Sequence, residues 1–72
     1  MASKVAVSAE VLEGIEHVRD NGHTDMWNVE EVIGWADMLG EGGAADWIER
    51  HRREYVIGMA TGFAVVNQGG AA

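Results

Sequence analysis

Residues 20–31, DNGHTDMWNVEE, decide the fold, because this stretch ends one helix and begins the next. Asn28 is a favourable N-cap residue, and Glu31 follows it at the spacing of a capping box. Trp27 precedes the cap and Val32 is the fourth residue of the following helix, which is the spacing of a hydrophobic staple. The stretch therefore predicts a polar loop that leads into a well-defined helix start.

The first predicted helix covers about residues 9–21. Ser8 is suited to cap its start, and Asn21 with Gly22 provides a left-handed stop. Gly14 lies in the middle of this helix, where glycine costs up to about 1 kcal/mol relative to alanine. We therefore expect another helix to approach closely at Gly14. The apolar stripe that faces the core consists of Val11, Leu12, Ile15 and Val18.

Two further helices are predicted at about residues 29–39 and 44–61, joined by the connection 41–43. In each helix, residues at helical spacing share one face and form the buried stripe. The stripe of the first consists of Val29, Val32, Ile33, Ala36 and Leu39. That of the second consists of Ala44, Trp47, Ile48, His51, Tyr55, Gly58, Met59 and Gly62. Phe63, just beyond the last stop, is expected to fold back on the final turn. The fold class is therefore all-α, a compact three-helix domain.

The chain of 72 residues is expected to form a single domain over residues 1–72. Its two ends, residues 1–7 and 67–72, are expected to be loose and flexible. Within the first of them, residues 5–7 are compatible with an extension of the first helix or with a short strand. A domain of this size has a small core and no cysteine to reinforce it, so dimerisation or a partner is the remaining route to more burial.

The net charge of -7 makes contact with nucleic acid unlikely, because this field repels phosphates. No membrane association is expected: the uncharged residues 55–66 fall short of the about 20 that a membrane span requires. The start of the chain does not resemble a signal peptide. These features predict a cytoplasmic protein.

Large apolar side chains outside the predicted stripes indicate a contact surface for a protein partner or a second copy. They are Trp35 and Met38 in the second helix and Val56 and Ile57 in the third. Trp35 is the strongest candidate, because tryptophan is enriched at interface hot spots. Scattered surface hydrophobic residues are the simpler alternative.

Arg50 and Arg53 complete the set of candidate partner-binding residues, since three of the five basic residues cluster around His51. Contact with an acidic partner or with phosphate is one interpretation. The other is local pairing, because acids four residues earlier, Asp46 and Glu49, have the favourable orientation for ion pairs on a helix. The local interpretation accounts for most of their charge.

The sequence predicts no enzyme, no cofactor and no metal site. His23 and Asp25 are the only candidates for a metal ligand or a general base, and one histidine with scattered carboxylates falls short of a ligand set. Thr24 and Asp25 are expected to bond backbone groups of the loop. The glycines near residue 42 lack the lysine and the preceding strand of a phosphate-binding loop.

Irregular loop residues and helical residues together match a known pattern, in RDNGHTDMW at residues 19–27, Ala36, WIERHRREY at 47–55 and Thr61-Gly62. In these motifs the chain resembles a family of small proteins encoded by phages and prophages and catalogued as a domain of unknown function. The resemblance spans most of the chain, with Asp25 in place of the family's asparagine and Trp27 in place of its phenylalanine. It implies a viral or prophage origin and supplies no activity.

Taken together, these features favour a non-enzymatic phage accessory protein that works in the host cytoplasm by binding another protein or itself. One alternative is an acidic inhibitor of a host defence complex that mimics nucleic acid. Another is a helix-turn-helix DNA-binding regulator in residues 29–53, with residues 47–53 as the recognition helix. Asp46 and Glu49 oppose it, since they stand where that helix would read bases.

Overall fold

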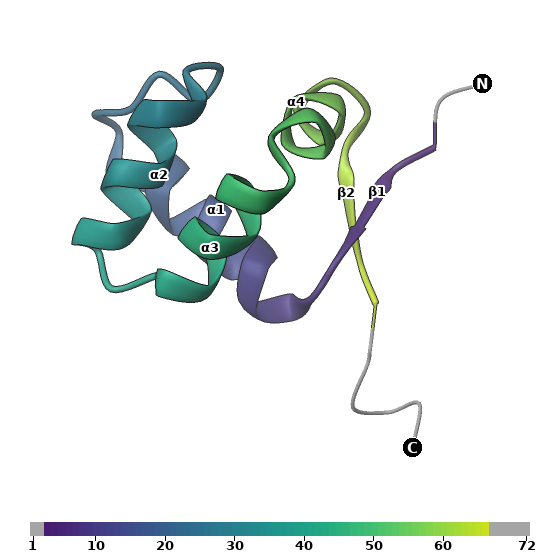
Figure 1. Cartoon of the computed structure of the whole chain (residues 1–72), viewed down its shortest axis with the longest axis horizontal. Helices are drawn as coiled ribbons and strands as arrows, with labels where there is room; N and C mark the ends of the chain where they lie inside the picture. Colours follow the sequence, from purple (N-terminus) through teal and green to yellow (C-terminus); the bar gives the residue numbers. More distant parts are fainter. Residues whose placement is uncertain (1–2, 67–72) are drawn as a thin grey trace.

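The computed structural model describes residues 3–66 and contains four helices and a small sheet (Figure 1). In chain order the elements are β1 (Val5–Val7), α1 (Ala9–Asn21), α2 (Val29–Met38), α3 (Gly42–Arg50), α4 (Arg52–Thr61) and β2 (Phe63–Val65). The fold is therefore mostly helical, as expected, but it is not a purely α three-helix domain. The expectation for residues 67–72 lies outside the described residues.

Helix α1 has the bounds that its capping residues predict. The Ser8 side chain accepts a hydrogen bond from the Val11 N–H, at 3.3 Å. At the other end Gly22 is left-handed, with φ of 82°, and its N–H donates to the Arg19 carbonyl. Both ends are therefore explained by residues next to them.

Helix α2 begins at the predicted cap, although its bonding differs in detail. The Asn28 side chain accepts from the Glu31 N–H at 3.2 Å. The Glu31 carboxylate does not return to the Asn28 N–H; it accepts from the Asp25 N–H at 3.3 Å, while Asn28 donates to the Asp25 carbonyl. Trp27 is 57% exposed, so the prediction of a staple that buries it is wrong, although Val32 is buried.

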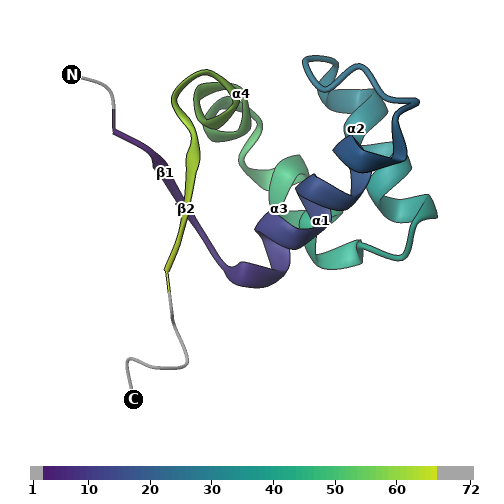
Figure 2. The same ribbon diagram turned by 180° about the vertical axis from the view of Figure 1, so that it is seen from behind.

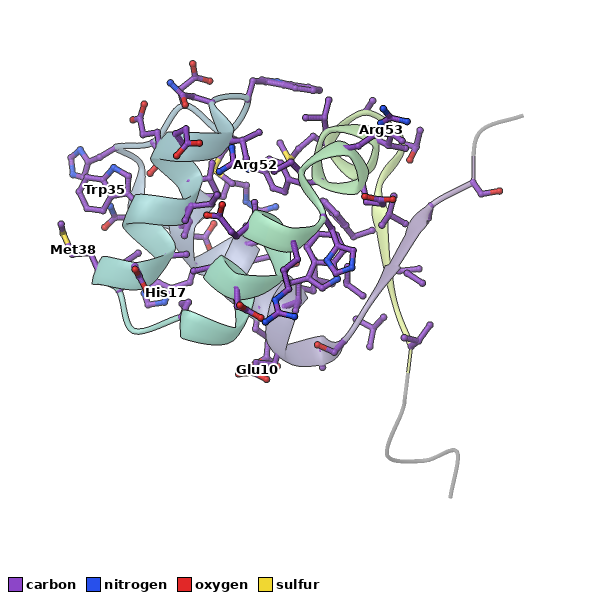
Figure 3. All side chains as sticks on the ribbon, in the orientation of Figure 1. Glu10, His17, Trp35, Met38, Arg52 and Arg53 are labelled. Atoms are coloured by element: carbon purple, nitrogen blue, oxygen red, sulfur yellow. The ribbon has the colours of Figure 1, made fainter. Side chains whose placement is uncertain are left out.

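The turn between α2 and α3, residues 39–41, lies earlier in the chain than the predicted connection 41–43. Gly40 is left-handed, with φ of 82°, and the Glu41 N–H donates to the Ala36 carbonyl at 2.7 Å. Gly42 and Gly43 then belong to the first turn of α3 and not to the connection. A side chain at Gly43 would meet the Glu10 carboxylate, which lies beside the start of α3 (Figure 3).

The predicted third helix is broken at His51 into α3 and α4. The His51 backbone leaves the helical region, with φ of -131° and ψ of 49°. Its Nδ1–H donates to the Trp47 carbonyl at 2.9 Å, and its ring stacks on Trp47 with centroids 4.7 Å apart. The same carbonyl also accepts from the His51 N–H at 2.9 Å, so the ring is a second donor to the end of α3 and the helical hydrogen bond is kept. The chain changes direction here, so that α4 is seen end-on where α3 lies across the view (Figure 1).

Residues 5–7 form the short strand that the sequence allowed and not a loose end: Val5–Val7 pairs with Phe63–Val65 in a parallel two-stranded sheet. The Val5 N–H donates to the Gly62 carbonyl at 2.9 Å, and the Val66 N–H donates to the Val7 carbonyl at 2.8 Å. Val7 is buried against the helices, and β-branched residues suit this position. The sheet therefore joins the two ends of the described chain on the side away from α2, as the reverse view also shows (Figure 2).

Two glycines allow close packing in the core. A Cβ at Gly14 would collide with the Cβ of Ala44, so α1 and α3 approach each other there as predicted. A Cβ at Gly58 would collide with the Phe63 ring, which folds back on α4. The fully buried core side chains include Val18, Val32, Ala36, Ile48 and Tyr55.

Candidate protein-binding surfaces

The predicted contact residues form two separate surfaces. Trp35 and Met38 lie at one end of the long axis, on α2, whereas Arg53 lies on the far side of the molecule, on α4 (Figure 3). We call Trp35 and Met38, with the neighbouring His23, the α2 surface. Four of the exposed residues of α4, namely Arg53, Val56, Ile57 and Ala60, form the α4 stripe, and the exposed Glu54 lies beside it. The expected single patch that combined Trp35, Met38 and Ile57 is therefore not formed within one chain.

The α2 surface combines an exposed methionine with a half-buried tryptophan. The Met38 side chain is 75% exposed, whereas Trp35 has one part packed against the core. The Trp35 ring stacks on His23 of the preceding loop, with centroids 6.0 Å apart and planes 25° apart. Gly34 has no side chain, and a shallow hollow of about 350 Å³ lies between Glu31, Gly34, Trp35 and Met38. The surface is thus ordered and mostly apolar.

The α4 stripe lies opposite the buried face of its own helix. Val56 is 39% exposed and Ile57 is 43% exposed, and both lie outward by the 100° rotation per residue. Tyr55 and Gly58 are buried on the other side. The helix is therefore apolar on both faces, although only one of them is covered by the described residues.

The arginines pair differently from the sequence prediction. Arg50 bonds Asp46 at 3.2 Å, as predicted. The predicted pair between Glu49 and Arg53 is not formed, because the break at His51 lies between them and removes the four-residue helical spacing. Glu49 instead accepts from Arg52 at 2.9 Å.

Arg52, and not Arg53 as predicted, is therefore the ion-pair partner of Glu49. It also pairs with Glu30 of α2, and the hydrogen bonds that its guanidinium donates to Glu49 and Glu30 raise the pKa of Arg52 above its usual range. Among residues 3–66, Arg53 has no ion pair, so its charge lies free at the start of α4.

His23 and Asp25, the candidate site residues in the loop between α1 and α2, both contact neighbouring residues. Asp25 accepts a hydrogen bond from the Trp27 N–H at 3.1 Å, as predicted, and His23 stacks on Trp35. The prediction that Thr24 bonds backbone groups is wrong, since its buried hydroxyl has no partner in the described chain. Within residues 3–66, no three side chains of the metal-binding types come together. Because its ring stacks on Trp35, His23 belongs to the α2 surface.

Tyr55 connects α4 to this loop. Its hydroxyl donates to the Met26 carbonyl at 2.6 Å, and its side chain is fully buried. Burial, with a smaller contribution from the charge of Asp25, raises the pKa of Tyr55 to about 12. The bond holds the loop that carries His23, and thereby positions the α2 surface.

The arrangement of α2 and α3 bears on the helix-turn-helix alternative. The two helices are joined by residues 39–41, a turn short enough for such a motif. However, Asp46 and Glu49 are exposed on α3 and pair with Arg50 and Arg52, so few cations of this face are free for DNA phosphates. This surface opposes DNA binding.

Sequence reasoning missed the exposure of Trp27 and the unequal distribution of charge. Trp27 fits the staple spacing, and only its surroundings show that it stays exposed. The charge distribution is visible in the sequence: all twelve acidic residues lie between Glu10 and Glu54, and no charged residue follows Glu54. The acidic part thus includes α2, whereas most of the α4 stripe lies in the uncharged part.

No described helix is long and apolar enough to cross a membrane. In the comparisons with known proteins, no protein-family model, no curated protein and no solved structure matches this chain.

Proposed function

We propose that this chain is a non-enzymatic phage accessory protein that acts in the host cytoplasm by binding another protein through the α2 surface. The observation that carries the proposal is the exposed Met38 beside the stacked Trp35, around a shallow apolar hollow. Apolar surface of this kind, framed by polar residues, is typical of protein-interaction sites.

The side chains of the α2 surface suit a partner with an apolar anchor. Tryptophan supplies a large contact area, and methionine adapts its flexible side chain to the shape of the partner. The stack on His23 restricts the Trp35 ring before binding, which lowers the entropy cost of ordering it.

The charges around the hollow indicate the chemistry of the partner. Glu31 lines the hollow and the exposed Asp37 precedes Met38. A complementary partner therefore presents an apolar side chain flanked by lysine or arginine, and the charge pairs mainly increase the association rate.

The test is capture of host proteins by the tagged chain, followed by calorimetric titration with the purified partner. Met38→Asp should weaken binding at least about tenfold, since it places a charge in the apolar contact. Trp35→Ala should also weaken it. The matched control is Ile57→Asp, an equal change on the other surface, which should leave this affinity within about twofold. Equal affinity of the wild type and Met38→Asp would refute the proposal.

A second candidate is supported by the distribution of charge. The twelve acidic residues between Glu10 and Glu54 make most of the helical surface negative, which suits an inhibitor that occupies a nucleic-acid site of a host defence complex. Binding should then be displaced by DNA or RNA and weaken steeply with salt. Affinity that does not change with salt would exclude this mechanism.

A further inference from the structure

We infer that the α4 stripe binds a second copy of this chain, with the two α4 helices packed antiparallel about a two-fold axis. This contact is separate from the α2 surface and does not depend on the proposed partner there. Three observations support it: the uncovered apolar face of α4, the distribution of acidic residues and the free charge of Arg53.

The first observation is that α4 has two apolar faces and only one core to pack against. Tyr55 and Gly58 are buried, while Val56 and Ile57, on the other side, are 39% and 43% exposed. The first turn of α4 is charged, but its residues 55–60 are apolar on every face, and such a segment is normally covered on all sides. In a self-complementary contact the same patch of each copy covers the other.

The second observation explains why the occupant is another copy. Two chains of net charge -7 repel each other, and the repulsion is weakest where neither brings carboxylates to the contact. Glu54, exposed at the edge of the α4 stripe, is the last acidic residue of the chain, so the stripe from Val56 to Ala60 contains no carboxylate of its own. At the α2 surface, by contrast, Glu31 and Asp37 of the two copies would face each other.

The third observation sets the direction of packing. Arg53 stands in the first turn of α4, where the helix dipole disfavours a positive charge, and it has no ion pair among the described residues. In an antiparallel pair, the guanidinium of Arg53 approaches the last turn of the partner's helix, where the dipole favours a cation. A parallel pair would instead bring the two arginines together.

These constraints define a small interface. With the axis between Val56 and Ile57, each Val56 faces the partner's Ile57, and Arg53 lies beside the small side chain of the partner's Ala60. A helix of ten residues is about 15 Å long, so the contact is smaller than the roughly 1,200 Å² at the lower end of standard interfaces. We therefore expect a dissociation constant on the order of 10–100 µM.

Sedimentation equilibrium of the full chain from about 5 µM to about 1 mM tests the contact. The wild type should shift from 7.8 kDa towards twice that mass. Ile57→Glu should remain monomeric over the range, whereas Met38→Glu, with the same charge change on a more exposed hydrophobic residue, should dimerise as the wild type does. Circular dichroism checks folding, and Val56→Lys replaces Ile57→Glu if that variant unfolds.

A second pair of variants tests the antiparallel direction. Arg53→Glu should weaken self-association about tenfold, while Arg50→Glu, which changes the net charge equally, should weaken it less than about twofold. A wild type that stays at 7.8 kDa throughout overturns the inference. Dimerisation of both Ile57→Glu and Val56→Lys at the wild-type strength also overturns it, and equal effects of the two arginine variants overturn the antiparallel packing. None of these outcomes affects the test at Met38.

Discussion

The joint between α1 and α2 and the joint between α3 and α4 are built in different ways. The first uses a left-handed Gly22 and the Asn28 cap, both within a few residues of the groups they satisfy. The second has no glycine and no side-chain cap; the His51 ring bonds the Trp47 carbonyl and stacks on its indole. Local caps are therefore visible in a sequence, whereas a break at a single histidine inside a continuous helical pattern is not.

The two joints also orient the two surfaces. The first carries His23 to Trp35 and so completes the α2 surface. The second turns α4 so that Tyr55 reaches the Met26 carbonyl while Val56 stays exposed. A change at either joint should therefore alter one surface more than the other, unless it affects the contacts that hold both.

The largest effect is expected at the α1–α3 contact that supports both joints. Gly14→Ala should lower the free energy of unfolding by about 2–3 kcal/mol, because the new methyl group collides with Ala44 and overpacks the core. The better helix propensity of alanine offsets only about 1 kcal/mol of the collision. Urea unfolding measures the change. The exposed Gly34→Ala, with no neighbour near its Cβ, is the control and should be neutral or stabilising.

The next effect concerns Tyr55, which links α4 to the first joint. The folded pKa of about 12 lies above the ordinary value of 10, so the folded state holds this proton more tightly. Its stabilisation is complete below pH 10 and is lost as the pH rises from 10 to 12, by about 2 kcal/mol. Thermal unfolding at several pH values should show the loss in the wild type.

Tyr55→Phe provides the comparison for this pH dependence. It should destabilise the protein at neutral pH by about 1 kcal/mol, since the Met26 carbonyl loses its donor. The stability advantage of the wild type should then shrink above pH 10 and reverse before pH 12, because the loss of about 2 kcal/mol exceeds the advantage of about 1 kcal/mol. A constant difference up to pH 12 would contradict the assignment of the titration to Tyr55.

A smaller effect is expected from the first joint alone. Asn28→Ala should cost about 1 kcal/mol, because the Glu31 N–H loses its acceptor at the start of α2. Asn28→Ser should retain most of the stability and serves as the control. Hydrogen exchange should accelerate in the first turn of α2 and leave α4 unchanged, so equal acceleration in both helices would count against a local role.

The smallest effect is expected from the second joint. His51→Ala removes the bond to Trp47 and the ring stack, but alanine favours the helix, so the stability should change by less than about 1 kcal/mol. The helical signal in circular dichroism should rise as α3 and α4 become more continuous. His51→Asn retains a side chain that bonds the backbone, and it should keep the break. An unchanged signal in His51→Ala would show that packing alone maintains the break.

Prediction from the sequence succeeded where one residue decides one local feature. The bounds of α1, the start of α2, the close approach at Gly14 and the return of Phe63 over α4 are confirmed. It allowed a short strand at residues 5–7 but did not predict its pairing, because Val5 and Phe63 are distant in the chain and neither residue by itself indicates its partner. It also failed for the pairing of Glu49 with Arg53, since helical spacing assumes a continuous helix.

For the candidate surfaces, too, the sequence indicated single residues but not contacts between distant parts of the chain. The sequence identified Trp35, Met38, Val56 and Ile57 as residues outside the buried stripes, and Met38, Val56 and Ile57 are exposed. It could not show that they form two surfaces, because their separation depends on the direction of α4 after His51. The exposure of Trp27 was hidden for a similar reason, since only its surroundings distinguish a staple from a free side chain.

By itself, the sequence determined where the first two helices begin and that Met38, Val56 and Ile57 lie outside the core. It also determined that every carboxylate side chain lies between Glu10 and Glu54. Caps, periodicity and charge act through neighbouring residues, and so they can be read along the chain. Only the tertiary structure decided the break at His51, the parallel pairing of Val5–Val7 with Phe63–Val65, and the separation of the two surfaces. These features depend on contacts between side chains and distant backbone, whose energies are realised only when the whole core is assembled.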